Sequence, residues 1–560
     1  MMKIIIKGQG TCSLNKKEFV GAGGEGEIYR KKQTAYKIYF DKKKVLPYAK
    51  IQELSAITDK NVISPKRIIT DIKNNPIGYT MRYLSNTYSL CQTFTKAFKD
   101  RNKITLEMML KLVLQMKKTI EHIHSKDILV VDLNEMNFLV DNKFTEVYFI
   151  DVDSYQTPSF PATAIMESIR DRHNPIFNKN TDWFSFGIVS FQMFCLIHPY
   201  KGKHPQLKTL DERMKANIPV FHKNVKYPKT CQSFDILPSA YKEWYKAIFY
   251  EGKRVPPPSD PQQIIIIPII YHTIKSNDSF EIIELNSYAK NVIKYISVEG
   301  VRITLVEPDE VYVDNKKEIN VNSTHFGITS NFHRVIGANV ESDNIILFNI
   351  KENKKIECNI SAENIMTYDG RIYIKKEDKI CEIIFIELPN KTLVSSEVVT
   401  NVLENATKIF DGVVIQNVLG SCVASVFPKT KTCYQVIIPE IKGYQIVDSK
   451  FDKNVLIVIA NKKGQYDKFV LKFNENFSSY ELRLVKNISY IGINFIVLDN
   501  GIVVHINEDE EMEIFSNKIG KNDIKVIGSK SIEGDMKLLK DGIRVLFSQG
   551  NKIYRLKMKK

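Results

Sequence analysis

Three polar side chains border two short apolar runs in residues 124–153 and restrict how this stretch folds. Asp132 is followed five positions later by Asn137, and Asp151 comes fourteen positions after that. The runs 138–140 and 147–150 have the length and composition of buried strands. Buried polar groups need partners, and carboxylate and amide oxygens are ligands for Mg²⁺. The alternative is a hairpin that merely has polar ends. It is disfavoured because a glycine-rich segment and a lysine within an apolar strand lie upstream.

The upstream feature is a glycine-rich segment in residues 17–39, which is expected to form a strand, a turn and two strands. Glycine lets backbone N–H groups approach phosphate oxygens without a Cβ in the way. The positions concerned are Val20, Gly21, Gly23, Gly24, Gly26 and Ile28. A dinucleotide-binding turn has similar spacing but opens a helix, whereas here Glu27-Ile28-Tyr29 continues as a strand. The pattern favours a nucleotide-binding hairpin.

Lys37 lies inside the next apolar strand, where an unpaired charge is costly. Residues 46–57 are expected to form the following helix, and Glu53 is its only acidic residue, so Glu53 is the candidate partner of Lys37. Residues 78–85 are expected to form a strand that leads into a connector and contains Met81 and Leu84. Residues 104–123 have the apolar spacing of an amphipathic, structural helix.

Together these segments resemble a protein-kinase domain over roughly residues 15–262. The resemblance rests on GAGGEGEIY, AYKIY, the run from His124 to Asp153, and Thr181-Asp182-Trp183-Phe184-Ser185-Phe186-Gly187 followed by His198-Pro199-Tyr200. It implies an α+β bilobal fold, with an N-lobe at about 1–84 and a C-lobe at about 85–262. The ordered combination is more specific than any single motif.

The resemblance also implies roles for individual residues. Lys37 matches the lysine on the α- and β-phosphates of ATP, and Glu53 its ion-pair partner. Asp132 matches the aspartate that orients the acceptor hydroxyl, and Asn137 and Asp151 match the two Mg²⁺ ligands. Met81, Leu84 and Leu139 would line the adenine site. Glu167 resembles the glutamate that closes the activation segment, with Arg254 as its structural partner.

Several departures distinguish the chain from the usual kinase pattern. Val130-Val131 replaces the His-Arg pair before the catalytic aspartate, so control by loop phosphorylation is not expected. Asn134 stands where a lysine is usual. Asp151-Val152-Asp153 replaces D-F-G and resembles a divergent bacterial group, and Asp153 is interpreted as a turn cap rather than a metal ligand.

The expected function is that of an active serine/threonine protein kinase that uses ATP and Mg²⁺. All four groups that position the phosphates and the hydroxyl are present, and catalysis of this kind is mostly positioning and charge neutralisation. A nucleotide-binding pseudokinase scaffold is one alternative, because of the departures. A small-molecule kinase is the other, because D-L-N-x-x-N also occurs in kinases of antibiotics and choline.

The length of 560 residues predicts more than one domain. Residues 1–262 carry 41 Lys and Arg against 26 Asp and Glu, and the rest carries 39 against 38. This basic first half has no nucleic-acid motif, so neither nucleic acid nor a membrane is an expected partner. The eight scattered cysteines form no C-x-x-C pair, which argues against a zinc site or a disulfide framework. A cytoplasmic protein is expected.

The second half has a different texture. Four prolines in residues 251–262 predict an extended connector, with the kinase-like part ending at 262, a linker at 263–275 and an all-β domain at 276–560. Strand–turn–strand units with D-G or N-G turns recur, with early spacings of about 35–45 residues, which is typical of propeller blades. A β-propeller of six or seven blades is expected, with stacked sandwiches as the alternative.

No catalytic constellation is evident in the second half. His325, His333 and His505 are isolated, and the acidic run 508–511 is expected to be solvated. A role in binding a protein partner or the substrate is expected by analogy with the fold.

Overall fold

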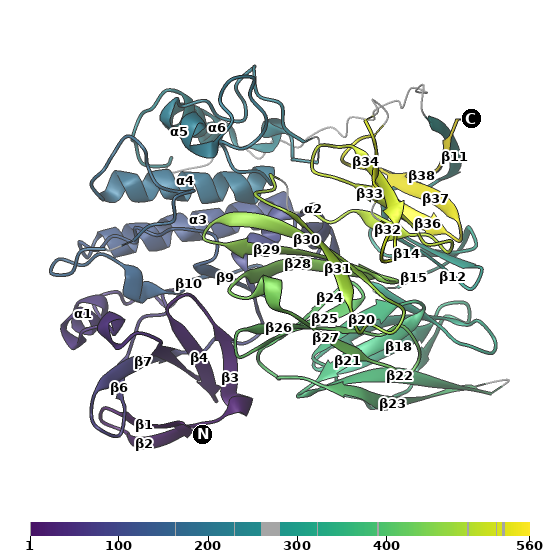
Figure 1. Ribbon diagram of the computed structural model, residues 1–560, viewed down its shortest axis with the longest axis horizontal. Coiled ribbons are helices and arrows are strands. Elements are labelled where there is room, and N and C mark those ends of the chain that lie inside the picture. Colours follow the sequence, from purple (N-terminus) through teal and green to yellow (C-terminus); the bar gives the residue numbers. More distant parts are fainter. Residues whose placement is uncertain are drawn as a thin grey trace.

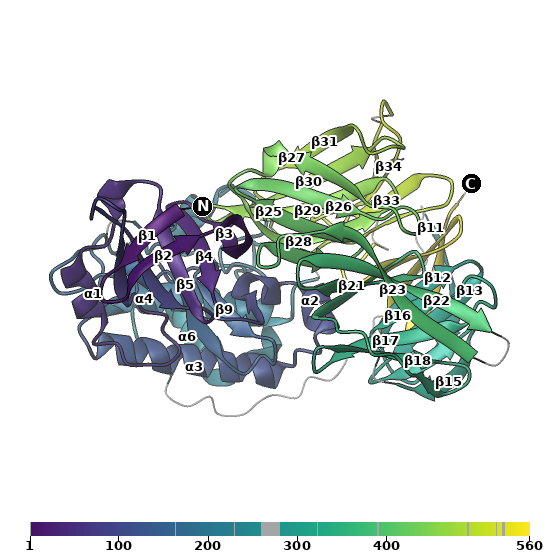
Figure 2. The same ribbon diagram turned by 90° about the horizontal axis from the view of Figure 1, so that it is seen from below.

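A computed structural model describes residues 2–162, 164–228, 230–258, 280–321, 323–388, 391–489, 492–521, 523–528 and 532–559. Two regions with different secondary structure lie side by side in Figures 1 and 2. Among the described residues, the first contains the α-helices with a large and a small sheet, and the second contains four-stranded sheets and a short 3₁₀ turn at Pro439–Ile441. The linker expected at 263–275 lies outside the described residues.

The first sheet holds seven antiparallel-paired strands at the beginning of the chain. In sheet order they are β2 (Gly10–Leu14), β1 (Met2–Ile6), β6 (Arg67–Thr70), β7 (Pro76–Arg82), β5 (Thr34–Tyr39), β4 (Gly26–Lys31) and β3 (Phe19–Ala22). A Cβ at Gly26 would lie 2.3 Å from Ile38 O, and one at Gly78 would lie 1.9 Å from Lys37 O. Glycine therefore lets β4 and β7 approach β5 closely on both sides.

Two helices form the centre of the helical portion. They are α3 (Leu106–His124) and α4 (Lys179–Cys195), which run side by side in Figure 1. The predicted amphipathic helix at 104–123 is α3, whose N-terminus is capped by Thr105 Oγ1 accepting from Met108 N over 3.2 Å. Residues 181–195 of α4 are buried on every face of the helix, which is typical of a helix at the centre of a hydrophobic core. The shorter helices are α1 (Tyr48–Leu54), α2 (Lys96–Arg101), α5 (Leu210–Lys215) and α6 (Ser239–Tyr245).

A three-stranded sheet connects the two portions of this first region. Its order is β10 (Val147–Phe149), β9 (Phe138–Asp141) and β8 (Thr87–Ser89). The two strands expected from the apolar runs are β9 and β10, which pair antiparallel with Leu139 opposite Tyr148. Ile63 N also donates to Phe149 O over 2.9 Å, so β10 is tied to the segment that enters the first sheet.

In the part of the chain that the structure describes, the second region consists of seven four-stranded antiparallel sheets. The first is β11 (Phe280–Ser287), β38 (Lys552–Met558), β37 (Arg544–Gln549) and β36 (Lys537–Asp541); the next are β12 (Val292–Val298), β13 (Val301–Val306), β14 (Glu310–Val313) and β15 (Lys316–Asn320); β16 (His325–Ile328), β17 (Val335–Glu341), β18 (Asn344–Asn349) and β19 (Lys354–Ile356); and β20 (Asn364–Tyr368), β21 (Arg371–Lys376), β22 (Lys379–Leu388) and β23 (Lys391–Asn401). The remaining three are β24 (Thr407–Phe410), β25 (Val413–Val418), β26 (Ser421–Val426) and β27 (Tyr434–Ile438); β28 (Gln445–Asp452), β29 (Val455–Lys462), β30 (Gln465–Phe473) and β31 (Tyr480–Val485); and β32 (Phe495–Val497), β33 (Ile502–Ile506), β34 (Met512–Ser516) and β35 (Lys525–Ile527).

The expected D-G turns occur within these sheets. Between β20 and β21, Asp369 and Gly370 both have positive φ, +50° and +73°, as a two-residue hairpin turn of the right twist requires. The sheet of β11, β38, β37 and β36 combines strands from both ends of the second region, because β11 pairs with β38, with Phe280 opposite Met558. Among the described residues, no helix is long and apolar enough to cross a membrane.

Candidate active site

Asp132 and Asn137 lie together on the loop between α3 and β9. Asn137 Nδ2 donates to Asp132 O over 3.0 Å and approaches Asp132 Oδ2 at 3.3 Å. Asn137 N donates to Asn134 O, and Ile150 N donates to Asn137 O, each over 3.0 Å. The second of these bonds ties the loop to the chain entering Asp151. Asp132 and Asn137, five positions apart in the sequence, therefore lie together beside Asp151.

The carboxylate of Asp132 accepts a second hydrogen bond, from Met166 N to Oδ1 over 2.8 Å. Burial raises the pKa of Asp132 above its ordinary value, while hydrogen bonds from Met166, Asn134 and Asn137 oppose the rise. A carboxylate whose pKa is raised is a better proton acceptor than an exposed one. Its Oδ1 faces a backbone donor of the same chain.

Asp182 holds the backbone just before this loop. Its Oδ2 accepts from Val130 N over 2.8 Å and contacts His124 Nε2 at 2.9 Å, and its Oδ1 accepts from Val131 N over 2.9 Å. Val131 has a φ of +62°, a conformation that β-branched residues rarely adopt. The three contacts to the buried Asp182 carboxylate stabilise this strained turn, which positions Asp132.

Lys37 and Asp151 face one another across the site. Lys37 Nζ lies 2.7 Å from Asp151 Oδ1. The Lys37 side chain is 8% exposed and that of Asp151 is 40% exposed. Burial and the nearby Asp153 charge raise the pKa of Asp151 above its ordinary value, against the effect of Lys37. Burial would lower the pKa of Lys37, but the charges of Asp153 and Asp151 raise it above its ordinary value.

The expected pairing of Lys37 with Glu53 is not what the structure shows. Glu53 lies on α1, and its Oε2 accepts from Ser159 N over 3.2 Å. Lys37 instead makes a second ion pair with Asp153, whose Oδ2 lies 2.7 Å from Nζ. The inward-facing charge on α1 is Lys50, which donates to Asp153 O over 2.7 Å. The residue type was the only sequence signal for Glu53, and it does not determine which helix face points inward.

Asp153 does not cap the following turn, contrary to expectation. Ser154 Oγ donates to Asp151 O over 2.8 Å, while the Asp153 side chain is 4% exposed and points to Lys37. Asp151, with a φ of +59°, begins the short 3₁₀ turn Val152–Ser154 that carries Asp153.

The glycine hairpin has the shape that the sequence predicts. β3 and β4 pair with Gly21 opposite Ile28, and Gly23 N donates to Gly26 O over 2.9 Å. A Cβ built at Gly21, Gly23 or Gly24 would meet nothing within 4 Å. Only Gly26 is required by packing; the other three leave open space in which a phosphate could approach the backbone. Val20 is half-buried on β3, beside this turn.

The three residues expected at an adenine are placed as follows. Met81 on β7 pairs with Ala35 and packs against the main core. Leu139 on β9 is half-buried and pairs with Tyr148. Leu84 lies beyond β7 and lines a cavity shared with the second region. Their contact with adenine stays a prediction.

Asn137 and Asp151 provide the oxygens that fit a divalent cation. Asn137 uses its amide nitrogen on Asp132, and Asp151 uses Oδ1 on Lys37, so one oxygen of each side chain remains for a ligand. Mg²⁺ is commonly held by one or two protein oxygens plus substrate phosphates and water. The described residues contain no cluster of three or more His, Cys, Asp or Glu able to hold a metal by themselves.

Arg254 does not pair with Glu167, which corrects the expected structural pair. Arg254 Nε donates to Asp171 Oδ2 and Arg254 Nη2 donates to Asp171 Oδ1, each over 2.6 Å, and the Asp171 side chain is 0% exposed. Glu167 is instead exposed and contacts Arg170 and Arg172 at 3.2 and 3.1 Å.

The second region contacts the loop that carries Asp132, and the segment around Met166, through the turn between β29 and β30 and the start of β30. Tyr466 Oη donates to Glu135 Oε1 over 2.5 Å, and burial raises the pKa of Glu135. A Cβ at Gly464 would lie 2.6 Å from Met166 Sδ and 2.8 Å from Ser168 Oγ. Lys201 Nζ donates to Ile488 O over 2.8 Å. The sequence carries no signal for these contacts, which join residues hundreds of positions apart.

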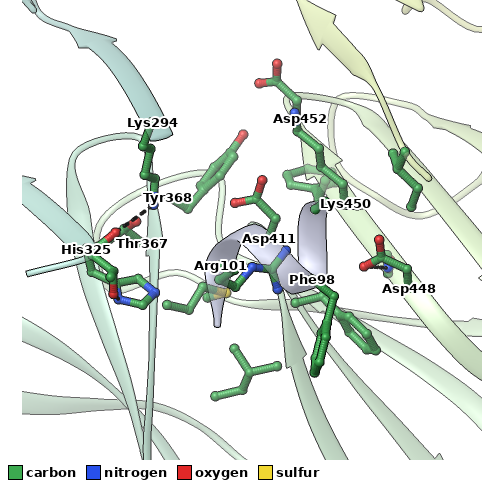
Figure 3. A pocket seen from close by; sticks show the side chains of 18 of the residues that line it. Phe98, Arg101, Lys294, His325, Thr367, Tyr368, Asp411, Asp448, Lys450 and Asp452 are labelled. Carbon is green, nitrogen blue, oxygen red and sulfur yellow. Dashed lines mark hydrogen bonds between the residues drawn. The ribbon is translucent and has the colours of Figure 1, made fainter. Parts of the chain in front are cut away.

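A cavity of about 2170 Å³ lies within the second region and reaches α2. It is lined by an edge strand from each sheet, namely β12, β16, β20, β24, β28, β32 and β36. Figure 3 shows Arg101 of α2 inside it, with Asp411 and Asp448 near the guanidinium group. Burial raises the pKa of Asp448 to about 6, and Arg101 opposes the rise. Lys537 Nζ, 2.6 Å from Asp100, also joins α2 to this region.

The isolated histidines have ordinary polar partners. His505 Nδ1 lies 3.0 Å from Glu513, His333 Nδ1 lies 3.3 Å from Glu299, and His325 contacts Thr324 Oγ1 at 3.0 Å. The acidic run is not merely solvated, because Glu508 lies 2.5 Å from the buried Lys468.

Comparison with known proteins relates the chain to protein kinases. No protein-family model matches it. A protein of Acanthamoeba polyphaga mimivirus, named as a serine/threonine-protein kinase, is 25% identical over 203 residues, which cover 34% of this chain and 71% of that protein. The cAMP-dependent protein kinase type 3 of Saccharomyces cerevisiae is 28% identical over 116 residues, or 18% of this chain and 27% of that protein. The similarity is low and covers part of the chain.

Proposed function

We propose that the chain is a protein kinase that transfers the γ-phosphate of ATP to serine or threonine hydroxyls of a protein, with Mg²⁺ as cofactor. The observation that carries this proposal is the convergence of Lys37, Asp151, Asn137 and Asp132 from three separate segments onto one site, with Lys37 Nζ 2.7 Å from Asp151 and Asn137 bonded to Asp132 at 3.0 Å. Similarity to named protein kinases supports the same class.

The proposed reaction assigns one task to each residue. The acceptor oxygen bonds to the γ-phosphorus, the bond to the bridging oxygen of ADP breaks, and the hydroxyl proton passes to Asp132. Lys37 neutralises charge on the α- and β-phosphates, and the backbone at Gly21, Gly23 and Gly24 closes over them. Asn137 and Asp151 would hold Mg²⁺, which supplies charge neutralisation at the phosphates.

We assign the second region, residues 276–560, to a seven-bladed β-propeller that binds a protein partner or the substrate. Support comes from the seven successive four-stranded sheets among the described residues and from the pairing of β11 with β38 in one of them. A cavity lined by an edge strand of each sheet supports the same assignment. Joining the first and last strands in one blade closes the ring of blades, which leaves only short, protected sheet edges.

One observation favours a second candidate, a nucleotide-binding scaffold without transfer activity. Met166 N donates to Asp132 Oδ1 over 2.8 Å, so one oxygen of the proposed proton acceptor already has a backbone donor. In this reading the nucleotide site serves only to stabilise the surface offered to partners.

Radiolabelled ATP tests the proposal. Purified full-length chain is incubated with Mg²⁺, labelled ATP and a mixture of protein acceptors, and phosphoamino acids are analysed. Phosphoserine or phosphothreonine that is absent from Lys37→Met supports it. Bound ATP with no transfer favours the scaffold, and label on a metabolite alone favours a small-molecule kinase.

A further inference from the structure

Asp153 is the most fully bonded acidic side chain at the site. Its Oδ2 lies 2.7 Å from Lys37 Nζ and also accepts from Tyr39 Oη, and its Oδ1 accepts from Tyr79 Oη over 2.7 Å. The side chain is 4% exposed. A buried carboxylate is tolerated only where donors compensate its charge, and here three donors from two strands of the first sheet do so.

Asp151 and Asp153 differ in what remains available to a ligand. Asp151 is 40% exposed, and its Oδ1 accepts from Lys37. Asp153 has both oxygens bonded, so a cation could reach it only by displacing a tyrosine or the lysine. This difference in free oxygens predicts that Asp151 binds the cation, whereas Asp153 positions Lys37.

Helix α1 adds no carboxylate to Lys37. Glu53 instead accepts from Ser159 N at 3.2 Å. The helix instead sends Lys50 to the backbone oxygen of Asp153, over 2.7 Å. Lys50 is itself buried, so this bond fixes the 3₁₀ turn that presents Asp153.

We infer that Asp153, and not Glu53, is the positioning residue that holds Lys37 against the nucleotide phosphates, with Tyr39 and Tyr79 fixing its carboxylate and Lys50 its backbone. This inference rests on the proposed nucleotide site. Because Asp153 is two residues from Asp151, the lysine anchor and the cation ligand belong to one rigid turn. Helix α1 then acts on Lys37 through the bond from Lys50 to the Asp153 backbone, and not through the carboxylate of Glu53.

A double-mutant cycle tests this assignment with nucleotide affinity as the readout. The full-length chain carries Asp153→Asn, Lys37→Met, or both, and the Kd of a fluorescent ATP analogue is measured without metal. Asp153→Asn is expected to weaken binding about tenfold, Lys37→Met similarly, and the double variant no further. Glu53→Gln is the matched control on α1 and is expected to change the Kd by less than about twofold.

Thermal melts of the nucleotide-free variants show which of them fold. If Asp153→Asn does not fold, Tyr79→Phe removes one donor from the same carboxylate, and Tyr36→Phe is its control because that ring packs in the cluster on the opposite face of β5. Tyr79→Phe is expected to weaken analogue binding, and Tyr36→Phe is not.

Three results would overturn the inference: an unchanged Kd in Asp153→Asn, an equal loss in Glu53→Gln, or a further loss when Asp153→Asn is added to Lys37→Met. Wild-type chain that binds no ATP analogue would overturn the proposed function as well. Wild-type chain that binds the analogue while Asp153→Asn binds it equally well would overturn the anchor alone.

Discussion

Met166 N donates a hydrogen bond to Asp132 Oδ1 over 2.8 Å. Met166 in turn lies against the β29–β30 turn, where a Cβ at Gly464 would come within 2.6 Å of its sulfur. The proposed proton acceptor is thus covered by a segment that the second region contacts. This relationship connects the sheet region to the access of an acceptor hydroxyl.

The first prediction concerns Gly464. It has a φ of +77° and no room for a Cβ, so Gly464→Ala displaces either the turn or the segment around Met166. If the contact holds Met166 over Asp132, the rate of phosphate transfer rises about fivefold or more, the usual scale of coupling between sites. Gly420→Ala is the control, with a similar φ of +86° and nothing within 4 Å. Equal rates in both variants would contradict the covering role.

The second prediction concerns the buried pair of Asp171 and Arg254. Asp171→Asn leaves the guanidinium group without its bidentate partner, and the free energy of unfolding is expected to fall by about 3–5 kcal/mol. Glu167→Gln, at an exposed position, is expected to change it by less than about 0.5 kcal/mol. Urea denaturation of both variants measures this. A larger loss in Glu167→Gln would restore the pairing that the sequence suggested.

The third prediction concerns pH and Lys201, which bonds Ile488 O between the two regions. Burial lowers the pKa of Lys201 from 10.5 to about 8. The unfolded chain therefore binds more protons between these values, and the free energy of unfolding rises with pH through this window. Relative to Lys201→Met, wild type is expected to gain about 2 kcal/mol between roughly pH 8 and pH 10.

Lys203→Met is the control for that measurement, because the Lys203 side chain is 71% exposed. Its unfolding free energy should follow that of wild type over the same pH range. A wild-type profile that runs parallel to that of Lys201→Met would show that Lys201 keeps its ordinary pKa in the folded chain.

The fourth prediction concerns the cation. ATP with Mg²⁺ is expected to raise the melting temperature of wild type more than ATP with EDTA, since a ligand that binds only the folded state stabilises it. Asp151→Asn should abolish the difference between the two conditions, whereas Asp127→Asn, whose side chain is 86% exposed, should keep it. A magnesium dependence that survives in Asp151→Asn would exclude Asp151 as a ligand.

The elements around the site could be predicted because their apolar periodicity is local. The runs 138–140 and 147–150 became β9 and β10, and the helix expected at 104–123 became α3. The Asp369-Gly370 turn followed from the need for positive φ at two successive residues.

The partners of individual charges could not be predicted, because they depend on how each element is rotated and docked. Lys50 rather than Glu53 faces the site, although both lie on α1. Arg254 pairs with Asp171, four residues from the expected Glu167. The positive φ of Asp151 starts the turn that carries Asp153, and no local pattern marks that residue as a lysine partner.

The central claim is that Asp132 accepts the proton in a phosphoryl transfer from ATP. The most direct measurement compares wild type with Asp132→Asn for incorporation of labelled phosphate into protein and for ATP affinity. The account predicts that Asp132→Asn loses transfer by at least about a hundredfold, within the range for a lost general base, while its ATP affinity and melting temperature stay close to wild type. Wild-type chain that binds ATP and transfers no phosphate, or Asp132→Asn that transfers it as fast as wild type, would contradict the account.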